Sequence, residues 1–189
     1  MFVLVESGSV TKFLANNRGI QIGDVKHPAS IFSLWSQDER NAIGIYEVEI
    51  DKTNFKDIEY YTNTDMTYTY DSSANKVKGT YGTATAKELA DKTVDGVVQK
   101  GLKTIKKELI DSQCASILAP SDWRVVKEQE TGDDMDSGWK TWRGNVRTKC
   151  NSMQTQIDNA ANVDALAALY TYNTDNPPTR PLGEFPVKE

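Results

Sequence analysis

Residues 139–157 read WKTWRGNVRTKCNSMQTQI, and this stretch decides the fold of the second half of the chain. Its apolar side chains recur at steps of three or four residues, which places them on one face of an α-helix. Asp133, Asp134 and Asp136 precede the stretch and suit the positive end of a helix dipole. We therefore expect the helix to begin near Asp136 or Ser137. The apolar face consists of Trp139, Trp142, Val146, Cys150, Met153 and Ile157.

A second apolar stripe precedes this helix. Thr85 and Glu88 have the spacing of a capping box, so we expect a helix from there to Leu118, before Pro120 forces a stop. A polar connection over residues 121–136 would join the two helices into an antiparallel hairpin. Such a hairpin leaves part of its apolar seam open to the N-terminal part, a second copy or another protein. The stripe contains Leu89, Val94, Val98, Leu102, Ile105 and Leu109, and then Ile110, Cys114 and Ile117.

The last part of the chain carries a weaker pattern. Leu166 and Leu169 indicate a short third helix over about residues 162–170. From residue 173 to 189 the sequence is rich in Asn, Pro and Thr and ends in an apolar Phe185-Pro-Val segment. This composition predicts an extended arm, which stays ordered only where a partner or a docking groove holds it.

The first half of the chain is rich in aromatic residues, Thr and turn residues, which is typical of short strands. Alternation over residues 45–50 predicts a half-buried strand. Ser36 and Glu39 form a capping box that opens a short helix ending at Gly44. The segments 67–70 and 76–81 predict a β-hairpin that projects from this domain or links it onward. Further strands are expected over residues 2–5, 10–14 and 19–23.

These patterns predict an α+β protein of four parts. The parts are a small β-rich domain with one short helix over residues 1–62, a β-hairpin or linker over 63–84, an antiparallel helical hairpin domain with a third short helix over 85–172, and an extended C-terminal arm over 173–189.

Charge and composition argue against several classes of function. The chain has 22 Lys and Arg against 27 Asp and Glu, a net charge of −5, and a nucleic-acid partner is disfavoured because phosphate binding needs clustered cations. No segment has the roughly 18 apolar residues of a membrane span, and the N-terminus lacks a signal-peptide pattern. We therefore expect no membrane partner and synthesis in a cytoplasm. Cys114 and Cys150 lie on apolar stripes and are expected to be buried free thiols.

The sequence contains no pattern typical of a catalytic site. His27 is the only histidine and stands before Pro28 in a predicted loop. Phosphate-loop, dinucleotide, serine-elbow and zinc-protease motifs are absent. The acidic loop 132–136 lacks the central glycine and the final glutamate of an EF-hand, so we interpret it as the start of a helix. We expect no enzyme activity, no cofactor and no metal.

One segment resembles a known family. Ile117-Leu-Ala-Pro-Ser-Asp-Trp123 ends in a small residue, Asp and Trp; an acidic loop follows, and then an aromatic residue, an arginine and a second arginine four residues on. Over about Leu109 to Met153 this pattern resembles the tail assembly chaperone domain encoded beside phage tail-fibre genes. The matching residues are Asp122, Trp123, Trp142, Arg143 and Arg147.

Two other parts of the chain bear on this resemblance. Residues 28–48 are similar to segments that precede the domain in tail-associated proteins of marine phages. The third helix and the arm that ends near Phe185 depart from the family, whose members are shorter at this end. The departure leaves two possibilities open, a chaperone that leaves after assembly and a protein that stays in the particle.

The resemblance implies a phage tail accessory protein that is made in the host cytoplasm and located in the virion tail. We expect an adaptor or hinge that binds tail-fibre and/or baseplate proteins, with a homo-oligomer as a further possibility. One alternative is a transient fibre-assembly chaperone. The other is a carbohydrate or host-receptor binding module that uses Trp35, Trp139 or Trp142 as a stacking platform.

Eight residues are expected to bind a partner or to support the binding surface. Across the hairpin, Asp122 would accept a charge-assisted hydrogen bond from Arg143 or Arg147, and Trp123 would pack over the open end. The full set is Asp122, Trp123, Trp139, Trp142, Arg143, Val146, Arg147 and Phe185.

Overall fold

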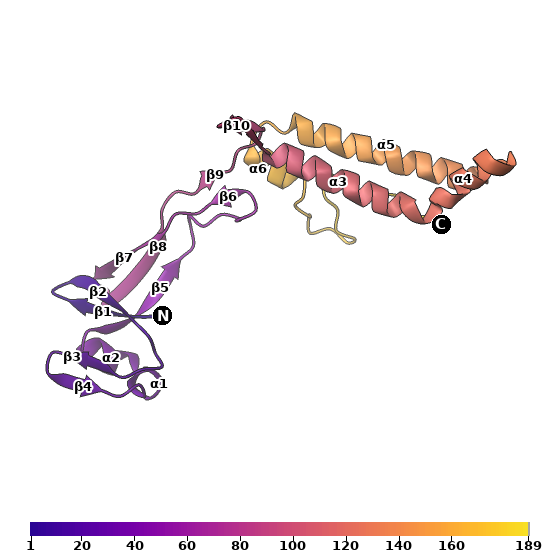
Figure 1. Ribbon diagram of the computed structural model, residues 1–189. Helices are drawn as coiled ribbons and strands as arrows, with labels where there is room; N and C mark the ends of the chain where they lie inside the picture. Colours follow the sequence, from indigo (N-terminus) through magenta and orange to yellow (C-terminus); the bar gives the residue numbers. More distant parts are fainter. Residues whose placement is uncertain (189) are drawn as a thin grey trace. The chain divides into compact units, whose positions relative to one another are not determined.

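The computed structural model describes residues 1–188 and divides into two compact units, Met1–Thr85 and Ala86–Glu189 (Figure 1). The first unit is rich in strands and the second is built mainly of helices, so the predicted α+β class is confirmed. Each unit has its own buried residues and is described by itself.

A five-stranded sheet forms the first unit, in the order β2-β1-β5-β8-β7. Neighbouring strands are antiparallel except β5 and β8, which are parallel. The edge strands β2 and β7 contact each other, and the rings of Phe13 and Tyr68 lie 4.8 Å apart, so the twisted sheet curls toward closure. The strands are β1 (Phe2–Glu6), β2 (Ser9–Leu14), β5 (Ile45–Asp51), β7 (Met66–Asp71) and β8 (Lys76–Tyr81), and a short β6 (Tyr61–Thr62) lies outside this sheet.

Each face of this sheet carries its own apolar cluster, because successive side chains of a strand point to opposite faces. The first cluster consists of Val3, Tyr46, Val48 and Val77. The second joins the sheet to a cover of short elements through Phe2, Leu4, Ile20, Ile31, Phe32 and Ile45. The cover contains β3 (Ile20–Ile22), β4 (Val25–His27), α1 (Ile31–Leu34) and α2 (Gln37–Ala42).

Local signals in this unit are largely confirmed. The Ser36 side chain accepts from the N–H of Glu39, and the Glu39 carboxylate accepts from the N–H of Ser36 at 2.7 Å, so the predicted capping box opens α2. Gly44 follows the helix with a φ of +82°. The hairpin of β7 and β8 is also present. Its expected role as a projection or linker is wrong, because β8 pairs with β5 and fully buried Val77 lies opposite Val48.

Residues 85–101 form no helix, which corrects the predicted start of the first long helix. Asp95 and Gly96 have φ values of +51° and +77°, as a type I′ hairpin turn requires. β-branched residues flank this turn and favour strands. Thr85 and Glu88 therefore open no helix despite their spacing. The segment contains β9 (Thr85–Ala86), β10 (Lys92–Val94) and β11 (Val97–Gln99).

Two long helices, α3 (Leu102–Leu118) and α5 (Ser137–Asn159), pack side by side in the second unit (Figure 1). Helix α5 follows the prediction, with Asp136 as its N-cap. The predicted stripe of α3 is partly wrong, because Ile105 and Leu109 are 47% and 44% exposed. Its buried positions recur every four residues instead, at Leu102, Lys106, Ile110, Cys114 and Leu118.

The chain itself encloses the buried residues of α3 and α5, contrary to the expectation that their seam stays open. Helix α6 (Val163–Ala168), the predicted third helix, contributes the fully buried Leu166. Leu182 is fully buried as well, and the Nζ of Lys149 on α5 donates to its carbonyl at 2.8 Å. The end of the predicted arm, from Leu182 to Pro186, therefore lies against the chain's own helices, whereas residues 173–179 are exposed.

The predicted polar connection over residues 121–136 contains a helix, α4 (Asp122–Thr131). Helix α3 ends at Leu118 as predicted, but a 3-10 turn, η1 (Ala119–Ser121), carries the chain directly into α4. Pro120 is tolerated there because the first turn of a helix needs no N–H donor from it. Gly132, with a φ of +75°, ends α4.

Candidate protein-binding surface of the helical unit

A buried arginine ties α5 to the junction between α3 and α4. Arg143 is 4% exposed. Its Nη2 donates to Asp122 Oδ1 at 2.6 Å, and its Nη1 donates to Leu118 O at 2.9 Å and to Ser121 Oγ. Leu118 is the last residue of α3, and the carbonyl groups at the end of a helix have no N–H donor within the helix. Arg143 and the Ser121 hydroxyl both donate to the Leu118 carbonyl instead. The predicted bond between Asp122 and Arg143 is confirmed.

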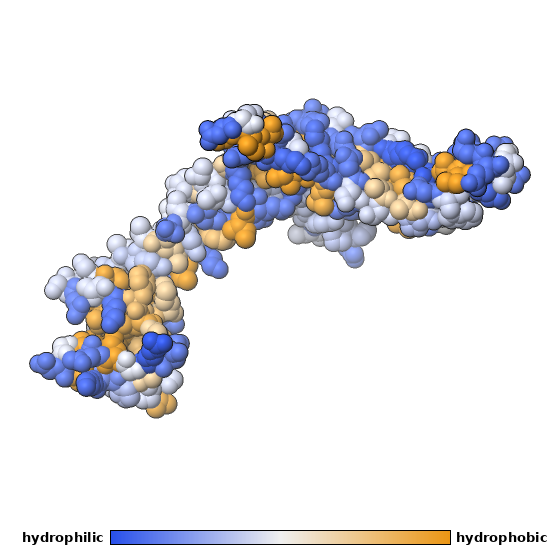
Figure 2. Space-filling model, in the orientation of Figure 1, coloured by the Kyte–Doolittle hydropathy of each residue, from blue (hydrophilic) through white to orange (hydrophobic). Residues whose placement is uncertain are grey.

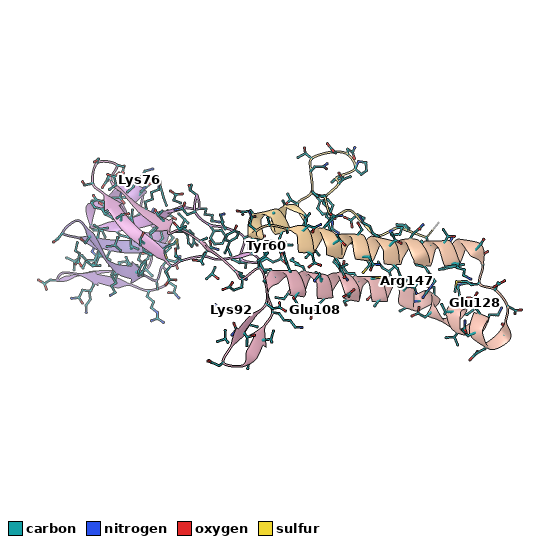
Figure 3. All side chains as sticks on the ribbon, turned by 90° about the horizontal axis from the view of Figure 1, so that it is seen from above. Tyr60, Lys76, Lys92, Glu108, Glu128 and Arg147 are labelled. Atoms are coloured by element: carbon teal, nitrogen blue, oxygen red, sulfur yellow. The ribbon has the colours of Figure 1, made fainter. Side chains whose placement is uncertain are left out.

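The two other predictions about this cluster need correction. Arg147 is exposed and is not among the partners of Asp122 (Figure 3). Trp123 does not close the end of the hairpin, since its side chain is 55% exposed. The reason is that residues 122–131 form a helix instead of a loop, which leaves Trp123 in the first helical turn with much of its ring open to solvent.

Three tryptophans and one arginine form an aromatic–arginine cluster beside this junction. The guanidinium of Arg124 lies 4.5 Å from the ring centre of Trp123 and 4.3 Å from that of Trp139. Trp139 in turn meets Trp142 edge to face, with ring centroids 5.5 Å apart. Stacking of a planar guanidinium on aromatic faces is favourable. The cluster is therefore preorganised within the single chain.

Helix α4 presents an apolar face to solvent. None of its ten residues is buried. Trp123 and Val126 stand three residues apart, on one side of the helix, and are 55% and 52% exposed. We call this pair the α4 face. Figure 2 shows apolar surface among hydrophilic residues at this end of the unit, a pattern typical of protein-binding sites.

Polar contacts hold α4 against α5. Lys140 on α5 forms an ion pair with Glu128 at 3.2 Å. The hydrogen bond from Lys140 lowers the pKa of Glu128, with a smaller effect from the backbone of Met135. Because the Lys140 side chain is 64% exposed, solvent screens this pair and it contributes little free energy by itself. The position of α4 thus depends mainly on the Arg143 junction.

The acidic loop starts α5, as predicted. Asp136 Oδ1 accepts from the N–H groups of Gly138 at 3.0 Å and Trp139 at 3.2 Å. A small pocket of about 220 Å³ lies between this loop and α4. It is lined by Trp123, Arg124, Lys127, Asp133, Asp134, Met135 and Asp136. Within residues 1–188, no group of three or more potential metal ligands comes together.

The C-terminal residues lie against α3 and α5. Trp142 Nε1 donates to the carbonyl of Pro186 at 3.0 Å. Phe185 is half-buried and lines a hollow of about 580 Å³ together with Ile117 and other residues of α3. Val146, in contrast, is fully buried. It is therefore a core residue and supports the surface without forming part of it.

Both cysteines are buried free thiols, as predicted. Burial raises the pKa of Cys150 to about 12, and the neighbouring Cys114 and Asp111 add to the shift. A thiol with such a pKa stays protonated near neutral pH and is a poor nucleophile. The cysteines therefore contribute packing to the helical unit.

The tryptophans considered for sugar stacking are partly covered by other side chains. Trp35 packs against the second apolar cluster of the sheet unit and meets the ring of His27 edge to face at 5.7 Å. Arg124 and Lys188 lie 4.3 Å and 5.3 Å from the ring centre of Trp139. A sugar would have to displace these groups, which favours protein binding over carbohydrate binding.

Three residues of this surface escaped the sequence-based predictions. Ser121 is buried against Arg143, Arg124 lies between two tryptophans, and Leu182 completes the core. The sequence does contain a sign of the role of Ser121, because it is the small residue before the Asp122-Trp123 pair. For Leu182 the only signal is one apolar side chain between Pro181 and Gly183, which is too short a pattern to predict burial.

Comparison with protein-family models, curated proteins and solved structures finds no match for this chain. In the described part of the chain, no helix has the length and apolar character that a membrane crossing requires. The functional proposal therefore depends on the geometry above and on the resemblance in the sequence.

Proposed function

We propose that the chain is a non-enzymatic accessory protein of a bacteriophage tail, an adaptor that binds tail-fibre and/or baseplate proteins. The exposed α4 face beside the aromatic–arginine cluster carries this proposal. Tryptophan and arginine are the side chains that most often dominate the free energy of protein interfaces. Here Trp123 is presented to solvent while Arg124 restrains its ring, so little side-chain entropy is lost on binding.

The assignment to a phage tail is supported by residues of the family-like motif. Asp122 and Arg143 lie 21 residues apart in sequence and form a direct hydrogen bond. Trp123 follows Asp122, and Trp142 precedes Arg143, so the bond brings four of the five matching residues to one end of the helical unit. Only Arg147 stays outside this junction. The hydrogen bond between Arg143 and Asp122 fixes α4 against α5, and so holds Trp123 and Trp142 near each other.

The division into two units suits an adaptor. Each unit encloses apolar clusters or helices of its own, so each can keep its fold while a different partner binds it. A transient fibre-assembly chaperone is the second candidate, and it would use the same exposed α4 face. The adaptor and the chaperone differ in one respect: an adaptor stays in the finished particle, and a transient chaperone does not.

Binding to purified tail proteins tests the proposal. We expect the full chain to bind the fibre or baseplate protein of its phage in calorimetry, and Trp123→Ser combined with Val126→Ser to weaken binding about tenfold or more, since a tryptophan hot spot contributes about 2 kcal/mol. The matched control is Val97→Ser, which changes a 66% exposed valine on β11. Equal affinities for both variants, or no binding of the unchanged chain to either protein, would contradict the proposal.

A further inference from the structure

We infer that the surface between α3 and α5 under residues 185 and 186 is a binding groove for an extended partner segment in which a proline follows an aromatic residue. The chain's own Phe185 and Pro186 occupy it and stand in for that partner. We call this site the arm groove. The inference rests on the proposed protein-binding function, and it adds a second site and the chemistry of its ligand.

The contact at the centre of the groove is the hydrogen bond from Trp142 to the arm. Trp142 Nε1 donates to Pro186 O at 3.0 Å. An indole N–H is a donor only and needs an acceptor when it is partly buried. Aromatic grooves that bind proline-rich peptides use preformed extended backbone, which costs little entropy to hold. The same chemistry is present here within one chain.

The arm does not fill the groove. On the α5 side, a hollow of about 330 Å³ borders Pro186 and is lined by Gly138, Thr141 and Asn145 among others. On the α3 side, the hollow of about 580 Å³ borders Phe185. Both hollows are open to solvent, so the surface beside the bound segment has room for larger side chains than the arm supplies. Val187 at its end is 85% exposed.

The base of the arm, residues 180–184, is anchored separately from its tip, residues 185–188. Leu182 is fully buried, and Lys149 donates to its carbonyl. Glu184 pairs with Arg180 at 2.8 Å and accepts from the Tyr172 hydroxyl at 2.5 Å. These contacts end at Glu184, so the tip can leave the groove while the core of the unit stays closed. A tip tethered so near competes with any free peptide at high effective concentration.

The occupied groove also indicates the chemistry of the partner. The arm offers an aromatic residue and a proline, and two residues further on Lys188, whose ammonium lies 5.3 Å from the ring centre of Trp139. A cation over an indole face is favourable. The matching ligand is therefore an extended aromatic–proline segment with a basic residue two positions after the proline.

A peptide with the sequence of residues 181–188, PLGEFPVK, is the direct probe. In the full chain, Phe185→Ser, Pro186→Ser and Val187→Ser together weaken the tip and leave Leu182 in place. We expect this arm variant to bind the peptide at least about tenfold more tightly than the unchanged chain does, because its own tip competes less. Adding Trp142→Phe, which removes the N–H and keeps an aromatic ring, abolishes that gain. Equal binding by the unchanged chain and the arm variant, or no effect of Trp142→Phe, overturns the inference.

A second measurement uses the unchanged chain and so does not depend on how the variant folds. Excess peptide is expected to shift the backbone NMR signals of residues 185–188 toward those of a free segment, and signals that stay in place overturn the inference. Dimers of the unchanged chain that are detected by light scattering and lost in the arm variant would show that the groove holds the arm of a second copy, and would also overturn it. These peptide experiments contain no tail protein. A negative result therefore counts against the arm groove and leaves the proposed binding to tail proteins to its own test.

Discussion

At the scale of single residues, Arg143 contributes most to the candidate surface. Arg143→Ala leaves the Leu118 carbonyl and the Ser121 hydroxyl without their charged donor in a buried place. Hydrogen bonds to charged groups contribute about 1.5–3 kcal/mol each, so we expect a loss of about 2–3 kcal/mol in the free energy of unfolding. Urea denaturation of the helical unit measures it.

The matched control is Arg147→Ala, which removes the same side chain one helical turn away on the exposed surface. We expect a change within about 0.5 kcal/mol. Asp122→Ala is expected to fall between the two, because the Asp122 side chain is 59% exposed and solvent screens its attraction to Arg143. If both arginine variants lost the same stability, the buried junction would have no special role.

Cys150 gives a prediction about reactivity and pH. Burial raises its pKa to about 12 from an ordinary 9.0, so the folded thiol keeps its proton over a range in which the unfolded thiol loses it. The stability that Cys150 contributes is therefore complete below pH 9 and decreases as the pH rises toward 12. At pH 8 we expect a thiol-specific aryl disulfide to react with it only after unfolding.

Ser152→Cys supplies the control for that labelling, because Ser152 is exposed on the same helix. The added thiol is expected to react within minutes while the two native cysteines stay protected. Rapid labelling of all three cysteines in the folded protein would show that the α3–α5 interface is open.

At the scale of elements, α4 is expected to be the least stable of the helices with ten or more residues. It has no buried residue, whereas α5 contributes five to the core. Helices held by few apolar contacts open locally at a lower free energy than the core. We expect backbone amides in residues 126–131 to exchange with solvent at an opening free energy at least about 2 kcal/mol below that of residues 146–157. Equal protection, measured by hydrogen exchange, would mean that α4 is part of the core.

The same elements show what the sequence could reveal. Helix α5 was predicted well because six apolar residues recur along one face and an aspartate precedes them. Helix α4 was missed because its few apolar residues are exposed and give no clear stripe. The start of α3 was placed too early because Val94 and Val98 fit a helical spacing, although Asp95 and Gly96 between them form a hairpin turn.

The candidate binding surface, like the helices, could be predicted only in part. The bond between Asp122 and Arg143 follows from the spacing of two helices that a short connection brings together. The exposure of Trp123 and the enclosure of the seam by Leu182 do not, because they depend on how residues far apart in sequence pack.

At the scale of the whole molecule, the two units are expected to unfold independently. Ile45 is fully buried in the first unit and Met153 in the second. Ile45→Ala and Met153→Ala are each expected to cost about 2–5 kcal/mol, but only in their own unit. The helical far-UV circular dichroism signal reports the second unit, so its thermal transition should shift with Met153→Ala and stay in place with Ile45→Ala. One transition that both variants shift equally would contradict two independent units.

The adaptor role requires that the chain remain in the finished tail in contact with its partners. Quantitative cross-linking mass spectrometry of purified phage particles tests this most directly, with infected-cell lysate measured in parallel. We predict several copies per particle and cross-links from lysines near the α4 face, such as Lys127 and Lys140, to a fibre or baseplate protein. A chain that is abundant in the lysate and absent from the particles would contradict the adaptor and leave the transient chaperone.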